Sequence, residues 1–145
     1  MDLVDKLSPR GFDCLCGNLR MAARAVTAVY DSHLRAAGLQ ASQLAVLWAV
    51  AGLRGETVSR IAAKLAMHDT ALVRNLRVLE GRGWVSIQVG SDRRQRLVDL
   101  TPAGREVFAQ ALPLWNRAQK QVEVALADGV AAMNARLLDL TRQVA

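Results

Sequence analysis

Three polar residues in the middle of the chain have the spacing of one helix face. Thr70, Arg74 and Arg77 recur at intervals of four and three residues, so a helix over Thr70 to Gly81 would carry them on one face. This face has two arginines, no acid and no apolar side chain to bury. Arginine binds phosphates and guanine edges, so the pattern predicts contact with the major groove of DNA.

A second basic group lies further along the chain, beside a turn. Arg93, Arg94 and Arg96 follow a cluster of turn-forming residues that ends at Asp92. Three arginines at a hairpin tip have nothing to pack against, whereas they suit phosphate or minor-groove contacts. A merely solvated tip is the plainer alternative, but the Asp92-x-Arg94 spacing beside the predicted helix favours DNA contact.

The elements that would hold the first group are two short helices. Apolar residues recur at three- and four-residue spacing in Ile61 to Leu65 and in Leu72 to Leu79, as in two amphipathic helices. The segment from Ala66 to His68 is long enough only for a turn, and Asp69 is expected to cap the second helix. In a helix-turn-helix, the second helix is the one that enters the major groove.

A two-stranded hairpin is predicted after this pair of helices. Trp84 to Val89 is rich in strand-forming residues, and Leu97 to Leu100 alternates apolar and polar residues as a returning strand does. Thr101 and Pro102 then open another helix, with Thr101 as the N-cap and Pro102 in the first helical position. The hairpin would therefore form a wing beside the helix-turn-helix.

Together these motifs resemble the MarR (multiple antibiotic resistance regulator) family of transcription factors. The motifs are Leu79-Glu80-x-Arg82-Gly83-Trp84-Val85, Asp92-x-Arg94 and Leu100-Thr101-Pro102-x-Gly104, in this order and spacing. The resemblance implies a minor-groove contact from Arg94, which Asp92 holds in place. It also implies that Thr70 and Arg74 lie on the groove-facing side of the recognition helix, and that two copies join through their first and last helices.

Long helices are predicted on both sides of the winged helix-turn-helix. One is expected over Phe12 to Ala36, ended by Gly38, and two more over Pro102 to Ala127 and Val130 to Val144. Pro113 should bend the helix that begins at Pro102. The apolar stripes of these helices exceed what one small lobe can cover, so pairing with a second copy is the economical arrangement.

The predicted fold is mainly α with a small β-hairpin wing, a winged helix-turn-helix with long N- and C-terminal dimerisation helices. We expect a single domain over residues 1–145, with dimerisation helices at 11–37 and 102–145 and the DNA-binding lobe at 42–101. The buried side of a helix capped by Ser42 is expected to hold Leu44, Leu47, Trp48 and Ala51.

The 145-residue chain has a formal net charge of +6, which indicates a polyanionic partner, nucleic acid first. No apolar run approaches the roughly 20 residues that a membrane span needs. The chain also starts without an apolar signal-peptide core, so we expect a cytoplasmic protein. We see no cluster of metal-ligand residues, no glycine-rich phosphate loop and no nucleophile elbow. Accordingly we expect no metal, no cofactor and no enzymatic activity.

The resemblance further implies a small aromatic acid bound between the terminal helices and the DNA-binding lobe. Arg20, His33 and Trp48 are the candidates to line such a pocket. Arg20 or His33 would meet the carboxylate, and Trp48 would stack on the ring. The expected function is a homodimeric transcriptional regulator, with repression favoured over activation, that binds a pseudo-palindromic operator and leaves it when this ligand binds.

A thiol-based input is the main alternative. Cys16 and its flanking leucines resemble the region that holds the peroxide-sensing cysteine of the organic hydroperoxide regulators, a branch of the same family. Tyr30 stands where one thiol-activating tyrosine of that branch would be, but Arg20 and Ala41 replace two others. We expect instead a buried Cys16 that packs as a small hydrophobic side chain. Cys14 and Cys16 should not bridge, because two positions apart on one helix they face different ways.

Two further hypotheses use different chemistry. A winged-helix module that binds only proteins would not need the basic wing or the basic recognition face. An enzyme with a nucleophilic cysteine would need a base near Cys16, and the only candidate is the remote His33. Salt-dependent DNA binding distinguishes a regulator from either of these.

Overall fold

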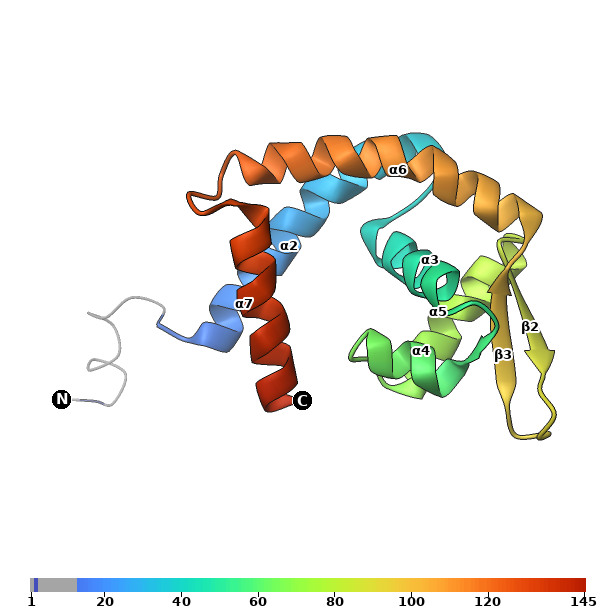
Figure 1. Cartoon of the computed structure of the whole chain (residues 1–145). Coiled ribbons are helices and arrows are strands. Elements are labelled where there is room, and N and C mark those ends of the chain that lie inside the picture. The colour runs from blue at the N-terminus through green and yellow to red at the C-terminus, as the bar shows by residue number, and fades with distance from the viewer. Residues whose placement is uncertain (1, 3–12) are drawn as a thin grey trace.

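The computed structural model describes Asp2 and residues 13–145, whose helices arch over a small winged lobe (Figure 1). The described residues hold six α-helices, one short 3₁₀ helix and three strands. In chain order these are α2 (Leu15–Leu34), η2 (Arg35–Ala37), α3 (Ala41–Leu53), β1 (Glu56–Thr57), α4 (Val58–Lys64), α5 (Asp69–Gly81), β2 (Val85–Val89), β3 (Arg96–Leu100), α6 (Pro102–Glu123) and α7 (Gly129–Val144).

The predicted helix-turn-helix is confirmed as α4 and α5. Thr57 caps α4, and its hydroxyl accepts the backbone N–H of Arg60. One face of α5 is fully buried, through Leu72, Leu76 and Leu79, as the apolar spacing predicted. The expected N-cap of α5 was wrong by one residue: His68 has the extended backbone of a cap, and Asp69 is already helical. Its carboxylate accepts the Ser59 hydroxyl of α4 at 2.6 Å, which ties the two helices together.

The predicted wing is confirmed, and the sheet has one strand more than expected. The sheet is antiparallel with the order β1-β3-β2, and Ile87 of β2 pairs with Val98 of β3. The additional strand, β1, is only two residues long and pairs Glu56 with Val98. So short a strand has no alternating pattern that a sequence could reveal.

The corner between α2 and α3 is closed by a glycine, as predicted. Gly38 adopts a left-handed conformation with φ of 71°, directly after the 3₁₀ turn of η2. The cap of α3 differs from the prediction, because Gln40 rather than Ser42 precedes the helix. The backbone N–H of Gln40 donates to the Gln43 side chain at 3.0 Å. Ser42 lies inside the first turn of α3.

The terminal helices have the predicted order with different ends. The expected start of the first helix at Phe12 lies outside the described residues, and α2 follows Cys14 as its N-cap. Thr101 caps α6 through the backbone N–H of Gly104, with Pro102 in the first turn, as predicted. The helix ends at Glu123 rather than Ala127 and contains Pro113, which has no backbone N–H to donate.

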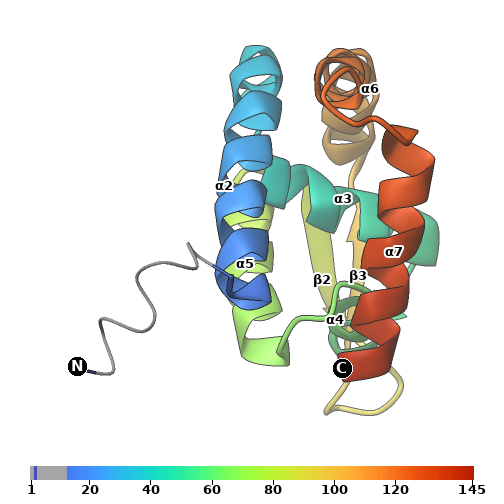
Figure 2. The same ribbon diagram turned by 90° about the vertical axis from the view of Figure 1, so that its left-hand side faces the viewer.

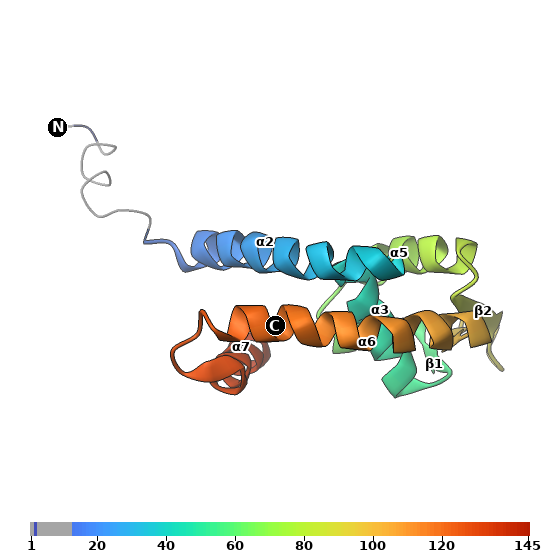
Figure 3. The same cartoon turned by 90° about the horizontal axis from the view of Figure 1, so that it is seen from above.

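The buried core lies within the winged lobe and under α6. It is built from α3, α4, α5, the sheet and the first half of α6. By contrast, Leu34 is the only buried residue of α2, and α7 has none. In Figure 2, α3 crosses between α2 on one side and α6 and α7 on the other. Figure 3 shows the same two sides from above, with α2 in one row and α6 and α7 in the other.

Much of the apolar surface of the terminal helices is therefore open within one chain. Leu15 is 62% exposed, and Val26, Met133 and Leu137 are each exposed by more than a third. These exposed side chains line a groove of about 600 Å³ between α2, α6 and α7. Within residues 13–145 no single helix is long and apolar enough to cross a membrane. The segments Leu15–Ala37 and Ala41–Leu53, which are bent by 73° relative to each other, reach the length and composition of a membrane span only when they are taken together.

Candidate DNA interface and effector cavity

The predicted recognition face lies on the exposed side of α5. Thr70, Arg74 and Arg77 are all exposed, whereas the opposite face of the helix is buried. Asn75 on the same helix donates its side-chain N–H to the Ala71 carbonyl at 3.1 Å. The helix thus presents a basic face whose arginine side chains can meet phosphates and base edges.

Hydrogen bonds within the wing tip hold its backbone in place. The Asp92 carboxylate accepts the backbone N–H of Arg94 at 3.0 Å, and the Asp92 carbonyl accepts that of Gln95 at 2.9 Å. The Arg96 guanidinium donates to the carbonyl oxygen of Arg93 at 2.8 Å. Asp92 therefore fixes the turn through backbone atoms, and the guanidinium groups of Arg93 and Arg94 remain exposed at the tip.

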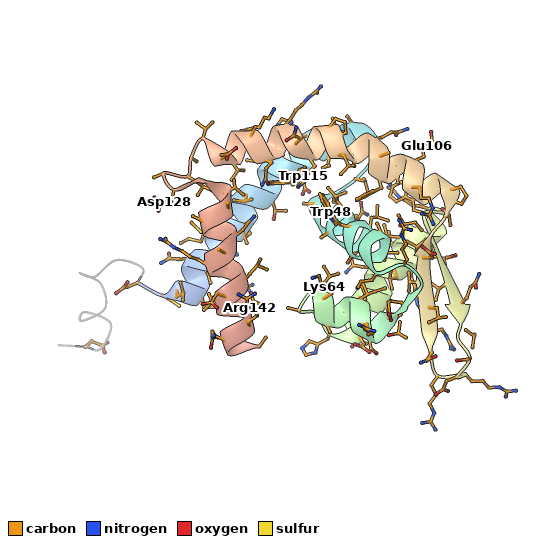
Figure 4. The ribbon with its side chains drawn as sticks, in the orientation of Figure 1. Trp48, Lys64, Glu106, Trp115, Asp128 and Arg142 are labelled. Carbon is orange, nitrogen blue, oxygen red and sulfur yellow. The ribbon has the colours of Figure 1, made fainter. Side chains whose placement is uncertain are left out.

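The hairpin tip extends beyond the helix-turn-helix, with nitrogen-ended side chains reaching outward from it (Figure 4). A hollow of about 410 Å³ separates the wing from α5, and Arg77 and Arg96 both line it. One arginine from each basic group therefore lines this hollow, together with Glu80 and apolar side chains. A nucleic-acid backbone lying between helix and wing would be contacted from both sides.

A larger cavity of about 680 Å³ lies between α3, α4 and the terminal helices. Trp48 lines this cavity and is 42% exposed, so its predicted place in the buried core was wrong. Its ring packs edge-on against Trp115, at 5.1 Å between centroids, and against Phe108 at 5.6 Å. Figure 4 shows Trp48 and Trp115 above the cavity and Lys64 of α4 on its lower side.

Lys64 is the only charged residue among the described residues that line this cavity. The sequence assigned neither Lys64 nor Trp115 to a pocket, and Trp115 lies on an apolar helical stripe that resembles a core face. The remaining lining is apolar, apart from the phenol of Tyr30. Burial raises the pKa of Tyr30, so its hydroxyl stays protonated at neutral pH and donates to the Gln119 side chain.

The other two predicted effector residues do not line the cavity with Trp48. His33 lies near the end of α2, with Nε2 at 2.8 Å from the Gln121 side-chain oxygen of α6. Arg20 is exposed thirteen positions earlier on the same helix, about 20 Å away along its axis. Within one chain, a small acid could not touch all three residues at once.

Both cysteines are exposed and unbridged within the single chain. The expected buried Cys16 was therefore wrong for one chain, because α2 projects beyond the lobe. Cys14 precedes the helix with extended backbone angles, and its Sγ accepts the Gly17 N–H at 3.5 Å. The two thiols thus do not share a helix, so helical spacing does not point them in different directions. No group of three metal-ligating side chains occurs in the part of the chain that the structure describes.

This fold and its basic face define a winged helix-turn-helix protein of the DNA-binding class. Residues 39–104 match a family model described as a winged helix DNA-binding domain. A sequence relative, an uncharacterised HTH-type transcriptional regulator of Bacillus subtilis (YwoH), is 27% identical over 96 residues, which are 66% of this chain and 70% of that protein.

Solved structures give the more specific likeness. The M. tuberculosis transcriptional regulator MosR in complex with DNA is 31% identical, covers 90% of this chain and 96% of its own, and superposes with a TM-score of 0.83. A mutant of E. coli MarR with operator DNA shares the fold, at 24% identity, a TM-score of 0.79, and coverage of 97% of this chain and 99% of its own. The chain belongs to the MarR family and is a DNA-binding transcriptional regulator.

Proposed function

We propose that the protein is a homodimeric repressor that binds a pseudo-palindromic operator and leaves it when a small aromatic acid enters the cavity beside Trp48. The observation that carries the effector part is the composition of that cavity. Two indole rings and one lysine line an otherwise apolar space of about 680 Å³. Such a lining suits a flat ring that carries one negative charge.

The proposed dimer covers the groove between α2, α6 and α7. Leu19, Ala22, Val26, Met133 and Leu137 line this groove, and the groove is almost entirely apolar. An exposed apolar surface of this extent marks an interaction site. A second copy is the simplest partner, since each chain would supply the same helices to a two-fold interface.

In the proposed DNA complex, the dimer would place its two α5 helices in successive major grooves, roughly 34–36 Å apart. Thr70, Arg74 and Arg77 would lie in the major groove, while Arg94 would reach the minor groove and Arg93 and Arg96 would meet phosphates. The hollow that Arg77 and Arg96 share supports this division, because it would hold the backbone between helix and wing.

The proposed release works through α4. Lys64 is the last residue of α4, and it is also a wall of the cavity. An acid that binds Lys64 and stacks on Trp48 would favour one position of the helix-turn-helix relative to α3 and α6. If that position spaces the two recognition helices badly for successive grooves, the ligand lowers operator affinity. Repression follows where the operator overlaps a promoter.

The test is fluorescence anisotropy of the full chain on DNA from upstream of its own gene. The complex is challenged with benzoate, salicylate and their uncharged amides. Release by the acids but not by the amides, lost in Lys64→Gln and Trp48→Ala, is the expected result. Retention of DNA at millimolar acid, or equal release from Lys64→Gln, would reject the cavity as the effector site. Run-off transcription from the same fragment then separates repression from activation.

A second candidate input is oxidation at the start of α2. The observation in its favour is that Cys14 and Cys16 are both exposed there. Tyr30 lies fourteen positions from Cys16, about 21 Å along the same helix, so it cannot activate the thiol of its own chain. Release of DNA by cumene hydroperoxide, reversed by thiol and absent in Cys16→Ser, would select this input over the aromatic acid.

A further inference from the structure

One arginine side chain connects the end of the recognition helix to the end of the first long helix. Arg82 follows α5 directly as its C-cap. Its Nη1 donates to the backbone carbonyl of Gly38 at 2.7 Å, across 44 positions of the chain. The same guanidinium lies over the ring of Trp84, with Cζ at 4.8 Å from the ring centroid.

The Gly38 end of this contact is a rigid corner. The left-handed glycine is held by its N–H to the Arg35 carbonyl at 2.9 Å. Leu34 and Leu39 on either side are buried, and the Asp31 carboxylate of α2 accepts the Ala41 N–H at 2.7 Å. The carbonyl that Arg82 contacts is therefore fixed relative to α2.

The Trp84 end is also fixed, at the root of the wing. The backbone N–H of Trp84 donates to the Leu79 carbonyl of α5 at 3.0 Å, and its carbonyl accepts the Thr101 N–H at 3.1 Å. Its ring is half-buried against the core. The Arg82 side chain thus bridges the α2 corner and the junction of recognition helix and wing.

Arg82 is poorly placed to contact DNA itself. The N-terminal residues of a recognition helix are the ones that reach base edges, and Arg82 lies beyond the opposite end of α5. It lines a polar hollow of about 310 Å³ together with Asp31, Arg35, Gln40 and Gln43. All of these neighbours belong to the α2–α3 corner, so the surroundings of Arg82 belong to the frame rather than to the DNA face.

We propose that Arg82 is a positioning residue that sets the angle of the recognition helix and wing relative to α2. The inference rests on the homodimer proposed above, in which the two α2 helices would fix the distance between the lobes. A hydrogen bond from a charged donor, strengthened by stacking on an indole, resists displacement more than a neutral contact does. Loss of Arg82 would therefore leave each lobe intact while its orientation varies.

The experiment compares full-length Arg82→Gln and Arg82→Lys with wild type, with Arg35→Gln as the matched control from the same hollow. Affinity is measured over a range of salt concentrations, on the complete DNA site and on a single half-site. We expect Arg82→Gln to weaken binding to the complete site roughly tenfold, with the half-site affinity and the salt slope unchanged. Arg82→Lys should recover part of the loss, and Arg35→Gln should match wild type.

Three binding results, or a monomeric wild-type protein, would overturn the proposal. Unchanged affinity of Arg82→Gln for the complete site excludes any role for the contact. A salt slope smaller by about one makes Arg82 a phosphate ligand instead. An equal loss of affinity for the half-site, together with a lowered thermal midpoint, would mean that Arg82 only stabilises the fold. Sedimentation velocity of the wild-type protein distinguishes the two proposals. A monomer would reject the homodimer and with it the role of Arg82. A dimer whose affinity for the complete site is unchanged by Arg82→Gln would reject only the role of Arg82.

Discussion

Gly104 lies so close to the backbone carbonyl of Trp84 that a methyl group on its Cα would overlap that oxygen. The contact joins the first turn of α6 to the root of the wing. Thr101 strengthens the same junction, because its N–H donates to the Trp84 carbonyl and its hydroxyl donates to the Gly83 carbonyl. The orientation of the wing thus depends on a backbone approach that only glycine allows.

Gly104→Ala should destabilise the protein by about 2–3 kcal/mol, because backbone atoms cannot move away as a flexible side chain can. The thermal midpoint should fall by several degrees, measured by calorimetry. Gly81→Ala is the matched control, since a Cβ at Gly81 meets nothing within 4 Å. Equal midpoints for the two variants would contradict the close approach.

Arg94→Ala should weaken DNA binding roughly ten- to a hundredfold and lower the salt slope by about one. The thermal midpoint should stay unchanged, because the guanidinium is exposed and only the backbone of Arg94 is bonded to Asp92. Anisotropy titrations at several salt concentrations measure both quantities. Arg35→Ala, which removes an exposed arginine of the α2–α3 corner, is the control, and equal behaviour of the two would remove Arg94 from the interface.

Leu137→Glu should convert the proposed dimer into monomers, because it places a charge in the apolar groove between α2, α6 and α7. Sedimentation velocity gives the mass, and operator binding should fall with it. Ala135→Glu introduces the same charge at an exposed position on the opposite side of α7 and should remain dimeric. A dimeric Leu137→Glu protein would mean that another surface joins the chains.

An aromatic acid should release Cys14→Ser and Cys16→Ser from DNA as it releases wild type, whatever effect oxidants have on these variants. Mass spectrometry after treatment with hydroperoxide shows whether a Cys14–Cys16 bridge or a sulfenic acid forms. A bridge that abolishes DNA binding, with neither serine variant affected, would make oxidation the input. Unaltered binding by the oxidised wild type would exclude it.

The helices and the wing were accessible to sequence reasoning because each has a local signature. Leu72, Leu76 and Leu79 repeat at helical spacing, and Thr101 with Pro102 marks a helix start that needs no distant contact. The basic face of α5 and the basic wing tip could also be predicted, because the residues of each lie close together in the sequence. Boundaries were less accurate, as at Asp69 and Ser42, because a helix cap depends on backbone angles that neighbouring residues can also adopt.

The cavity could not be located from sequence, since it depends on which elements pack together. Trp48 has the pattern of a core residue, yet its ring stands at the edge of an open space beside Trp115, a residue 67 positions away in the chain. Only the family resemblance grouped Arg20 and His33 with Trp48. The rise per residue of α2 separates Arg20 from His33 along the helix axis. The contact from Arg82 to Gly38 is also non-local and has no sequence pattern of its own.

The absence of any buried residue in α7 has a consequence for the cell rather than for the molecule. Under the proposed homodimer, the active species forms only when two chains meet. Below the dissociation constant of the pair, halving the number of chains lowers the number of dimers about fourfold. If the dimer represses transcription as proposed, repression would then fall more sharply than the protein level itself, and dilution by growth and division would release the target genes without any chemical signal.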